Sequence, residues 1–192
     1  MKYAVKFLAM IAATLAVPAF AQNSTWTIDP VHTQATFQAR HLSVANVRGS
    51  ISNVTGTVIW DPNNLSRDSV VATLDVNTVN TASDYRDKTI KGEDFFNVAK
   101  YPKMTFKSTS VQKSGSGYQV LGDLTLAGVT KQVTLNVDGP SAPQKGMQGE
   151  TVSGLSATTS IKRTDFNFGS KYPDGVLSDE IKITIDLEMD QK

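Results

Sequence analysis

The sequence contains no cysteine and only two histidines in 192 residues. The lack of cysteine excludes disulfide bridges and thiolate chemistry, so a hydrophobic core must hold the fold, and a chain of this length can build one. Enzyme motifs are missing as well: there is no G-x-S-x-G elbow, no H-E-x-x-H spacing and no glycine-rich phosphate loop before a helix. We therefore expect a protein that is not an enzyme and that holds no cofactor.

Long apolar runs are also scarce. One lies at the start of the chain, where Lys2 and Lys6 flank an apolar stretch that ends in an A-x-A site at residues 19–21. This run is shorter than the roughly 20 residues that span a bilayer. The pattern predicts a secretory signal peptide, residues 1–21, that is removed. Residues 22–192 then form a single exported domain without stable membrane insertion.

An excess of charge of one sign is absent too. The chain carries 19 Lys and Arg and 18 Asp and Glu, with a net charge of +1. Loss of Lys2 and Lys6 leaves 17 basic groups against 18 acidic groups, a net charge of −1. The basic residues form no stripe or block. The sequence thus has no electrostatic footprint for nucleic acid, and we expect no nucleic-acid partner.

Alternation of apolar and polar residues is what the sequence has in abundance. From Thr25 onward the pattern has a period of two, which is typical of strands with one buried face. A short connection at residues 127–130 that contains glycine predicts a hairpin. The predicted strands lie within residues 34–42, 54–60, 70–76, 104–106, 118–126, 133–137, 155–161 and 181–189.

About eight segments of this kind indicate an antiparallel all-β protein. A parallel α/β sheet would have strands that are apolar on both faces and separated by helices, which this sequence lacks. Alternation alone does not distinguish a two-sheet sandwich from one sheet closed into a barrel.

Residues 84–106 break the alternation. The stretch begins with charged residues, continues with the pair Phe95-Phe96 and ends at Tyr101-Pro102, where the proline forces an extended chain. The charged part predicts a short helical segment near residues 84–96 at the rim of the sheet. Phe95 or Phe96 is predicted to point inward as an apolar plug. A surface loop pinned by its aromatic residues is the alternative.

The same stretch carries a resemblance to a known family. Its pattern R-D-x-x-(I/L)-K-x-x-D-F-F-N/D-V-x-x-Y-P-x-(M/I)-T-F, from Arg86 to Phe106, resembles the signature of the YceI-like family, the bacterial periplasmic polyisoprenoid-binding proteins. Three further blocks agree: W-T-I-D-P-V-H-T at the start, G-D-L-T-L-A-G-V-T in the middle, and I-K-R-T-D-F followed by S-D-E-I near the end. Many relatives carry His where this chain has Thr89, so no role is transferred to that position.

The resemblance covers essentially the whole chain after residue 21. It implies a lipocalin-like, elongated antiparallel β-barrel, a periplasmic location and a polyisoprenoid ligand of the polyprenyl or isoprenoid-quinone type. Members of the family often form homodimers, which this sequence neither requires nor forbids. Trp26 lacks the G-x-W setting of the lipocalins, so the chain is not a lipocalin by sequence.

A barrel of this size either fills with its own side chains or holds one small ligand. Small residues alternate with bulky ones on the inward faces, but small residues also complement large neighbours in filled cores, so the pattern alone leaves both open. Few inward positions are polar, and His41 and Thr159 are the exceptions, which favours a dry apolar cavity. The small inward residues are Ala35, Ala39, Gly56, Ala72, Gly122 and Ala157.

We therefore predict that a polyisoprenoid lipid is sequestered or carried inside the barrel. His41 is a candidate for contacting its polar end, and a hydrogen-bonded core residue is the alternative for this position. Alternation gives the inward faces but does not say which members touch ligand and which only pack. The other predicted ligand-binding residues are Phe37, Val58, Leu74, Phe95, Phe96, Met104, Phe106, Leu124, Leu135, Leu155, Ile161, Phe166 and Ile183.

Two alternatives belong to other functional classes. One is an enzyme of isoprenoid or quinone metabolism that uses His32 or His41, and the other is a protein-interaction module with a filled barrel. His32 follows Asp29-Pro30 and is expected to fix the first turn. Zinc sites usually need three or four ligands, so two histidines with Asp29 nearby predict neither a metal site nor a catalytic residue.

Charged neighbours in two motifs are expected to be structural. The pairs Arg86–Asp87 and Arg163–Asp165 are predicted to form ion pairs or helix-end contacts.

Overall fold

The structure is a computed structural model that describes residues 24–191, so the predicted signal peptide lies outside the described residues. The described chain contains eleven strands, one α-helix and three short 3-10 helices. The helices are η1 (Leu65–Arg67), η2 (Val76–Thr78), α1 (Asp84–Lys91) and η3 (Arg163–Phe166). The strands are β1 (Ser24–Ile28), β2 (Gln34–His41), β3 (Ala45–Ile51), β4 (Val54–Trp60), β5 (Ser69–Asp75), β6 (Lys103–Ser114), β7 (Gly117–Leu126), β8 (Val129–Asp138), β9 (Gln144–Lys145), β10 (Thr151–Lys162) and β11 (Glu180–Gln191).

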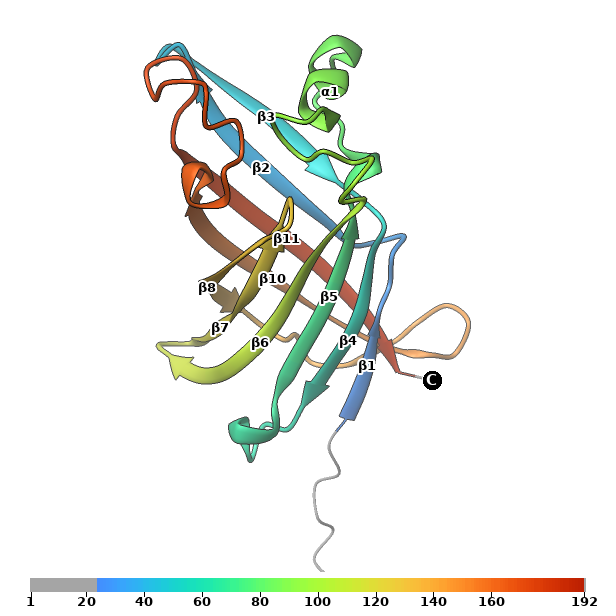
Figure 1. Cartoon of the computed structure of the whole chain (residues 1–192). Coiled ribbons are helices and arrows are strands. Elements are labelled where there is room, and N and C mark those ends of the chain that lie inside the picture. Colours follow the sequence, from blue (N-terminus) through green and yellow to red (C-terminus); the bar gives the residue numbers. More distant parts are fainter. Residues whose placement is uncertain (1–23, 192) are drawn as a thin grey trace, which may run out of the picture.

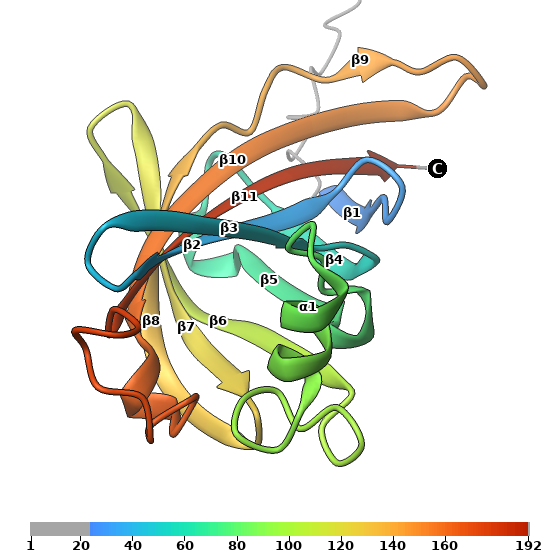
Figure 2. The ribbon, with the colours of Figure 1, turned by 90° about the horizontal axis from the view of Figure 1, so that it is seen from above.

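Eight of the strands close into an antiparallel barrel (Figures 1 and 2). They follow the order β11-β1-β4-β5-β6-β7-β8-β10, and the ladder between β10 and β11 joins the two ends of this series. That ladder runs without interruption from Thr151↔Gln191 to Lys162↔Glu180. The predicted all-β, elongated antiparallel barrel of about eight strands is therefore confirmed.

The barrel wall is extended at one end by β2 and β3. β11 pairs with β1 near its own C-terminus and with β2 from Asp186 to Lys182, so β2 continues the wall beyond β1. α1 lies beside β3 at this end, and the β4–β5 connection lies at the opposite end (Figure 1). We call these the helix end and the far end of the barrel.

Three strands, β1, β3 and β9, were not predicted by alternation. In β3 the inward positions are Val47, Gly49 and Ile51, so a glycine interrupts the apolar pattern. The ring of Phe37, which is the cross-strand partner of Gly49, occupies the space that a side chain there would need. β1 has only five residues and β9 only two, too few to show a period.

The helix α1 is shorter than the predicted segment near residues 84–96. The Ser83 side chain accepts a hydrogen bond from the Arg86 N–H and caps the first turn. Acidic residues in that turn and basic residues in the last one complement the helix dipole. The helix ends at Lys91 because the next residue, Gly92, adopts an extended conformation.

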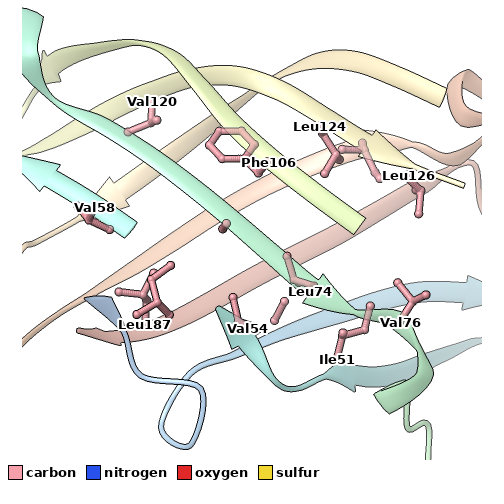
Figure 3. Close-up of a cluster of buried hydrophobic side chains, with 14 of the residues drawn as sticks. Ile51, Val54, Val58, Leu74, Val76, Phe106, Val120, Leu124, Leu126 and Leu187 are labelled. Carbon is pink, nitrogen blue, oxygen red and sulfur yellow. The ribbon is translucent and has the colours of Figure 1, made fainter. Parts of the chain in front are cut away.

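The inward faces bring apolar side chains from opposite walls toward one interior (Figure 3). β5 shows the alternation clearly, since Ala72 and Leu74 are buried while Val71, on the opposite face, is 48% exposed. The buried residues labelled in the figure are Ile51, Val54, Val58, Leu74, Val76, Phe106, Val120, Leu124, Leu126 and Leu187.

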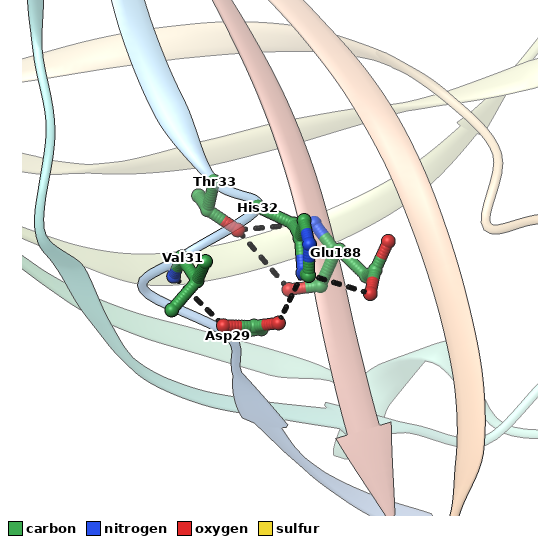
Figure 4. Close-up of polar contacts among 5 residues, drawn as sticks. All are labelled: Asp29, Val31, His32, Thr33 and Glu188. Carbon is green, nitrogen blue, oxygen red and sulfur yellow. Dashed lines mark hydrogen bonds and ion pairs between the residues drawn. The ribbon is translucent and has the colours of Figure 1, made fainter. Parts of the chain in front are cut away.

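A polar cluster fixes the connection between β1 and β2 (Figure 4). Asp29 accepts a hydrogen bond from the Val31 N–H, and its other carboxylate oxygen lies 2.6 Å from Nδ1 of His32. The Thr33 hydroxyl donates to the carbonyl of Glu188 and accepts from its N–H, which ties the turn to β11. The expected role of His32 in the first turn agrees with this geometry.

Arg163 holds the long connection between β10 and β11. Its side chain is 1% exposed and does not form the predicted ion pair with Asp165. Instead, its guanidinium donates to five backbone carbonyls and uses its full set of N–H groups. These carbonyls belong to Phe168, Gly169, Tyr172, Leu177 and Ser178.

The turn at His32 generates a prediction about pH. The hydrogen bond to Asp29 raises the pKa of His32, and the charges of Asp29 and Glu188 act in the same direction. Because the folded-state pKa is raised, protonation of His32 stabilises the folded protein, and this stabilisation is fully present below the unfolded-state pKa of 6.5. It is lost as the pH rises through the folded-state pKa. We expect His32→Gln to lower the free energy of unfolding more at about pH 5 than at about pH 9, measured by urea denaturation. Equal losses at both pH values would contradict an ionic contribution.

Arg163 generates a prediction about stability. Lysine carries only three donors, so Arg163→Lys leaves at least two of the buried carbonyls without a partner. We expect the free energy of unfolding to fall by about 2–4 kcal/mol in urea denaturation. The matched control is Lys162→Gln at the exposed neighbouring position, which should change it by less than about 0.5 kcal/mol. A similar effect of both substitutions would contradict the role of Arg163.

Candidate functional site

The barrel encloses a cavity of about 570 Å³, a volume typical of ligand-binding pockets. It extends from His41 and Tyr85 at the helix end to Asp68 and Pro140 at the far end. Its wall consists mainly of apolar side chains from β2 to β8, β10 and β11. The interior is hollow, which goes against the alternative of a filled barrel.

The structure brings together thirteen of the fourteen residues predicted to bind ligand, because all of them except Phe166 line this cavity. Phe166 is 2% exposed and packs in the hydrophobic core. It lies in η3, where the backbone has left the strand and the period of two no longer applies. Phe168 lines the cavity instead. Contact between these residues and a ligand stays a prediction.

The small inward residues fall into two groups. Ala35, Ala39, Ala72 and Ala157 line the cavity. Gly56 and Gly122 do not. A Cβ at Gly56 would collide with the Val71 carbonyl oxygen of the neighbouring strand. The ring of Phe106 covers Gly122, where a Cβ would collide with its Cζ. At Gly122 the small residue complements a large neighbour, as in a filled core, whereas the alanines contribute to the hollow.

Aromatic side chains close part of the wall at the helix end. Phe95 and Phe96 are both buried and line the cavity, as predicted for the plug. The Phe95 ring lies 5.2 Å from Phe168 and stacks on Tyr172 at 5.4 Å, and Phe96 lies 4.8 Å from Phe168. Edge and stacked aromatic pairs at these distances are favourable. The plug thus joins the segment after α1 to the β10–β11 connection that Arg163 holds.

Arg86 and Asp87 converge on one residue, Thr81. Nε of Arg86 donates to the Thr81 hydroxyl and an Nη donates to its carbonyl. The Asp87 carboxylate accepts from the N–H of Thr81 and lies 2.5 Å from its hydroxyl oxygen. The two side chains therefore form a helix-end contact that positions α1 beside the cavity.

The cavity meets solvent at the helix end. Three of its lining residues are exposed, His41, Tyr85 and Thr89, and all three lie on β2 or α1 at this end. His41 thus borders the cavity at its rim. Tyr85 of α1 is 85% exposed.

Asp68 is a polar lining residue that the alternation pattern should have indicated. It precedes Val70, Ala72 and Leu74 by an even number of residues, so it belongs to the inward face of the same strand pattern. Asp68 immediately precedes β5, and the predicted strand began only at Val70, so the alternation was not extended back to Asp68. The structure places it at the far end, buried and lining the cavity.

His32 lies outside the cavity, with 62% of its side chain exposed. Asp29, His32 and Glu188 place one ligand atom each within 4.8 Å of one another, a donor set that suits a divalent metal ion. His32 Nδ1 is engaged with Asp29 at 2.6 Å, and we assign this cluster to the β1–β2 turn.

No helix in the described part of the chain has both the length and the hydrophobicity of a membrane span.

Residues 26–189 match the YceI-like domain family. Protein YceI of Salmonella newport (strain SL254) is 37% identical over 157 residues, which cover 82% of this chain and 81% of that protein. A crystal structure of the YceI protein of Campylobacter jejuni is 32% identical with a TM-score of 0.70, covering 80% of this chain and 90% of that one. A polyisoprenoid binding domain from Saccharophagus degradans shares the fold at 18% identity with a TM-score of 0.62, covering 87% and 98%. With a match across nearly all of its described length, this chain belongs to the YceI-like family.

Proposed function

We propose that this protein is a non-enzymatic binding protein that sequesters or carries a polyisoprenoid lipid in its barrel. The observation that carries the proposal is the apolar hollow of about 570 Å³. Membership of the YceI-like family supports it, as does the fold shared with a polyisoprenoid binding domain. A polyprenyl chain or the tail of an isoprenoid quinone has the chemistry that such a wall accepts.

Burial of hydrocarbon supplies the binding energy. Each methylene that leaves water contributes about 0.8 kcal/mol, so one isoprene unit contributes several kcal/mol before the cost of ordering the chain. The ligand is proposed to enter at the helix end, where the lining residues His41, Tyr85 and Thr89 are exposed. A headgroup too large for the cavity would remain at this rim beside His41.

The proposed location is the periplasm. The basic start, short apolar run and A-x-A site of residues 1–21 support export. A carrier in that compartment would shield an insoluble chain from water during transfer.

The alternative of an enzyme rests on the two histidines. His32 is exposed outside the cavity, which leaves His41 at the rim as the histidine that borders it. If turnover of an isoprenoid substrate were observed and were lost in His41→Ala, the enzyme would replace the carrier.

A charge inside the wall tests the carrier function. Leu74→Asp places a carboxylate on the cavity surface, where burial against hydrocarbon is costly. We expect the folded variant to lose at least about nine-tenths of its co-purifying lipid, a loss of about 1.4 kcal/mol or more in binding. The measurement is mass spectrometry of solvent extracts from protein purified from its own host.

The matched control is Val71→Asp on the outer face of the same strand, where Val71 is 48% exposed. This variant should retain the lipid of the wild-type protein. Circular dichroism establishes that both variants are folded. A folded Leu74→Asp protein with a full complement of lipid, or wild-type protein that neither carries nor takes up polyprenyl lipid, would overturn the proposal.

A further inference from the structure

Two buried side-chain polar atoms have no hydrogen-bond partner among the described residues, and both lie toward the far end of the barrel. They are Oδ2 of Asp68 and Nε1 of Trp26. Ile59 pairs with Ser69, which brings Asp68 next to Trp60, and Trp26 pairs with Val58 on the neighbouring strand. Buried polar groups are nearly always hydrogen bonded. Of these two residues only Asp68 lines the cavity, so its unpartnered oxygen points to a group that binds there.

One carboxylate oxygen of Asp68 accepts a structural hydrogen bond, and the other has no hydrogen-bond partner among the described residues. Oδ1 accepts a hydrogen bond of 2.6 Å from the N–H of Asp61 and closes the β4–β5 turn. Oδ2 is buried without a partner, and the residue is 9% exposed and lines the cavity. The turn requires a single acceptor, which an asparagine would also supply. The structural role therefore explains Oδ1 and leaves Oδ2 without a role in the fold.

We propose that Asp68 forms a hydrogen-bonding subsite at the far end of the cavity for a small uncharged polar group, a hydroxyl or a carbonyl, on the inner end of a chain lipid. This inference rests on the proposed function, because the apolar wall between the helix end and Asp68 would hold the chain. A hydroxyl can donate to the carboxylate or accept from the carboxylic acid, whereas a carbonyl can only accept.

The two acidic groups at the subsite, Asp61 and Asp68 itself, disfavour an anionic ligand group there, and the cations Arg67 and Lys113 are each engaged with another side chain. Asp61 is 4% exposed and follows β4, and its carboxylate lies 3.7 Å from the guanidinium of Arg67 in η1. On the other wall, Tyr118 of β7 lines the cavity with the ammonium of Lys113 of β6 over its ring. Burial raises the pKa of Asp68 to about 6, and the charge of Asp61 acts in the same direction. The carboxyl is thus protonated below this pH and able to donate.

Binding of matched probes tests the subsite. Farnesol and β-farnesene have the same isoprenoid skeleton, but only farnesol has a hydroxyl. We expect delipidated wild-type protein to bind farnesol about tenfold more tightly than β-farnesene, the ratio that one hydrogen bond of roughly 1.4 kcal/mol produces. Asp68→Leu should abolish this preference and leave β-farnesene binding intact, and Asp68→Asn should keep it. Isothermal titration calorimetry gives both dissociation constants.

A carbonyl probe makes the test independent of the leucine variant, which also loses the acceptor for Asp61. We expect the preference of the wild-type protein for farnesal over β-farnesene to fall as the pH rises through about 6, because the ionised carboxylate cannot donate to a carbonyl. In Asp68→Asn the amide donates at every pH, so the preference should stay constant. This comparison separates Asp68 from His41 at the rim.

The outcomes distinguish the two proposals. Equal binding of farnesol and β-farnesene by the wild-type protein would overturn the subsite and leave the carrier function standing. A farnesal preference with the same pH dependence in wild type and Asp68→Asn would also overturn it. Binding of none of the three probes would overturn both proposals.

Discussion

Closure of the sheet determines how far apart the opposite walls lie. β11 pairs with β10 along its whole length and with β1 and β2 on its other edge, so the sheet has a fixed circumference. Eight strands set a diameter at which side chains either just meet or leave room for a ligand. Here the inward residues are mostly Val, Leu, Ile and Ala, and about 570 Å³ between them stays unfilled. The hollow thus follows from strand number and side-chain size together.

The two ends of the barrel are built by different interactions. At the far end, a hydrogen bond from the Asp61 N–H to Asp68 holds the connection between the paired strands β4 and β5. At the helix end, the wall includes segments outside the ladder. The N–H of Gly169 donates to the carbonyl of Asp94, the Phe95 ring packs on Phe168, and Arg163 organises the segment that presents both Gly169 and Phe168. Aromatic and guanidinium contacts replace ladder hydrogen bonds where the cavity meets solvent.

Strand positions and inward faces were predictable wherever alternation continued through several residues. The face of Ala72 and Leu74 and most of the cavity lining follow from this period alone, because burial of one face is what produces it. β3 was missed because Gly49 relies on the Phe37 ring from the next strand to complete its face. Such a contact is tertiary and leaves no local signal. Phe166 does not line the cavity because it lies in the 3-10 helix η3, where the period of two of the strand no longer applies.

Selectivity requires groups other than those that provide most of the affinity. Burial of hydrocarbon is nearly proportional to area, so an apolar wall accepts chains of similar length with similar energies. The few polar groups on a pocket wall then decide which chain binds and in which direction. In this cavity such groups lie at opposite ends, with His41 exposed at the helix end and Asp68 buried at the far end beside Asp61. A ligand hydrogen bond at the buried Asp68 would compete less with water than one at the exposed His41, so the proposed subsite would contribute more to discrimination than the rim.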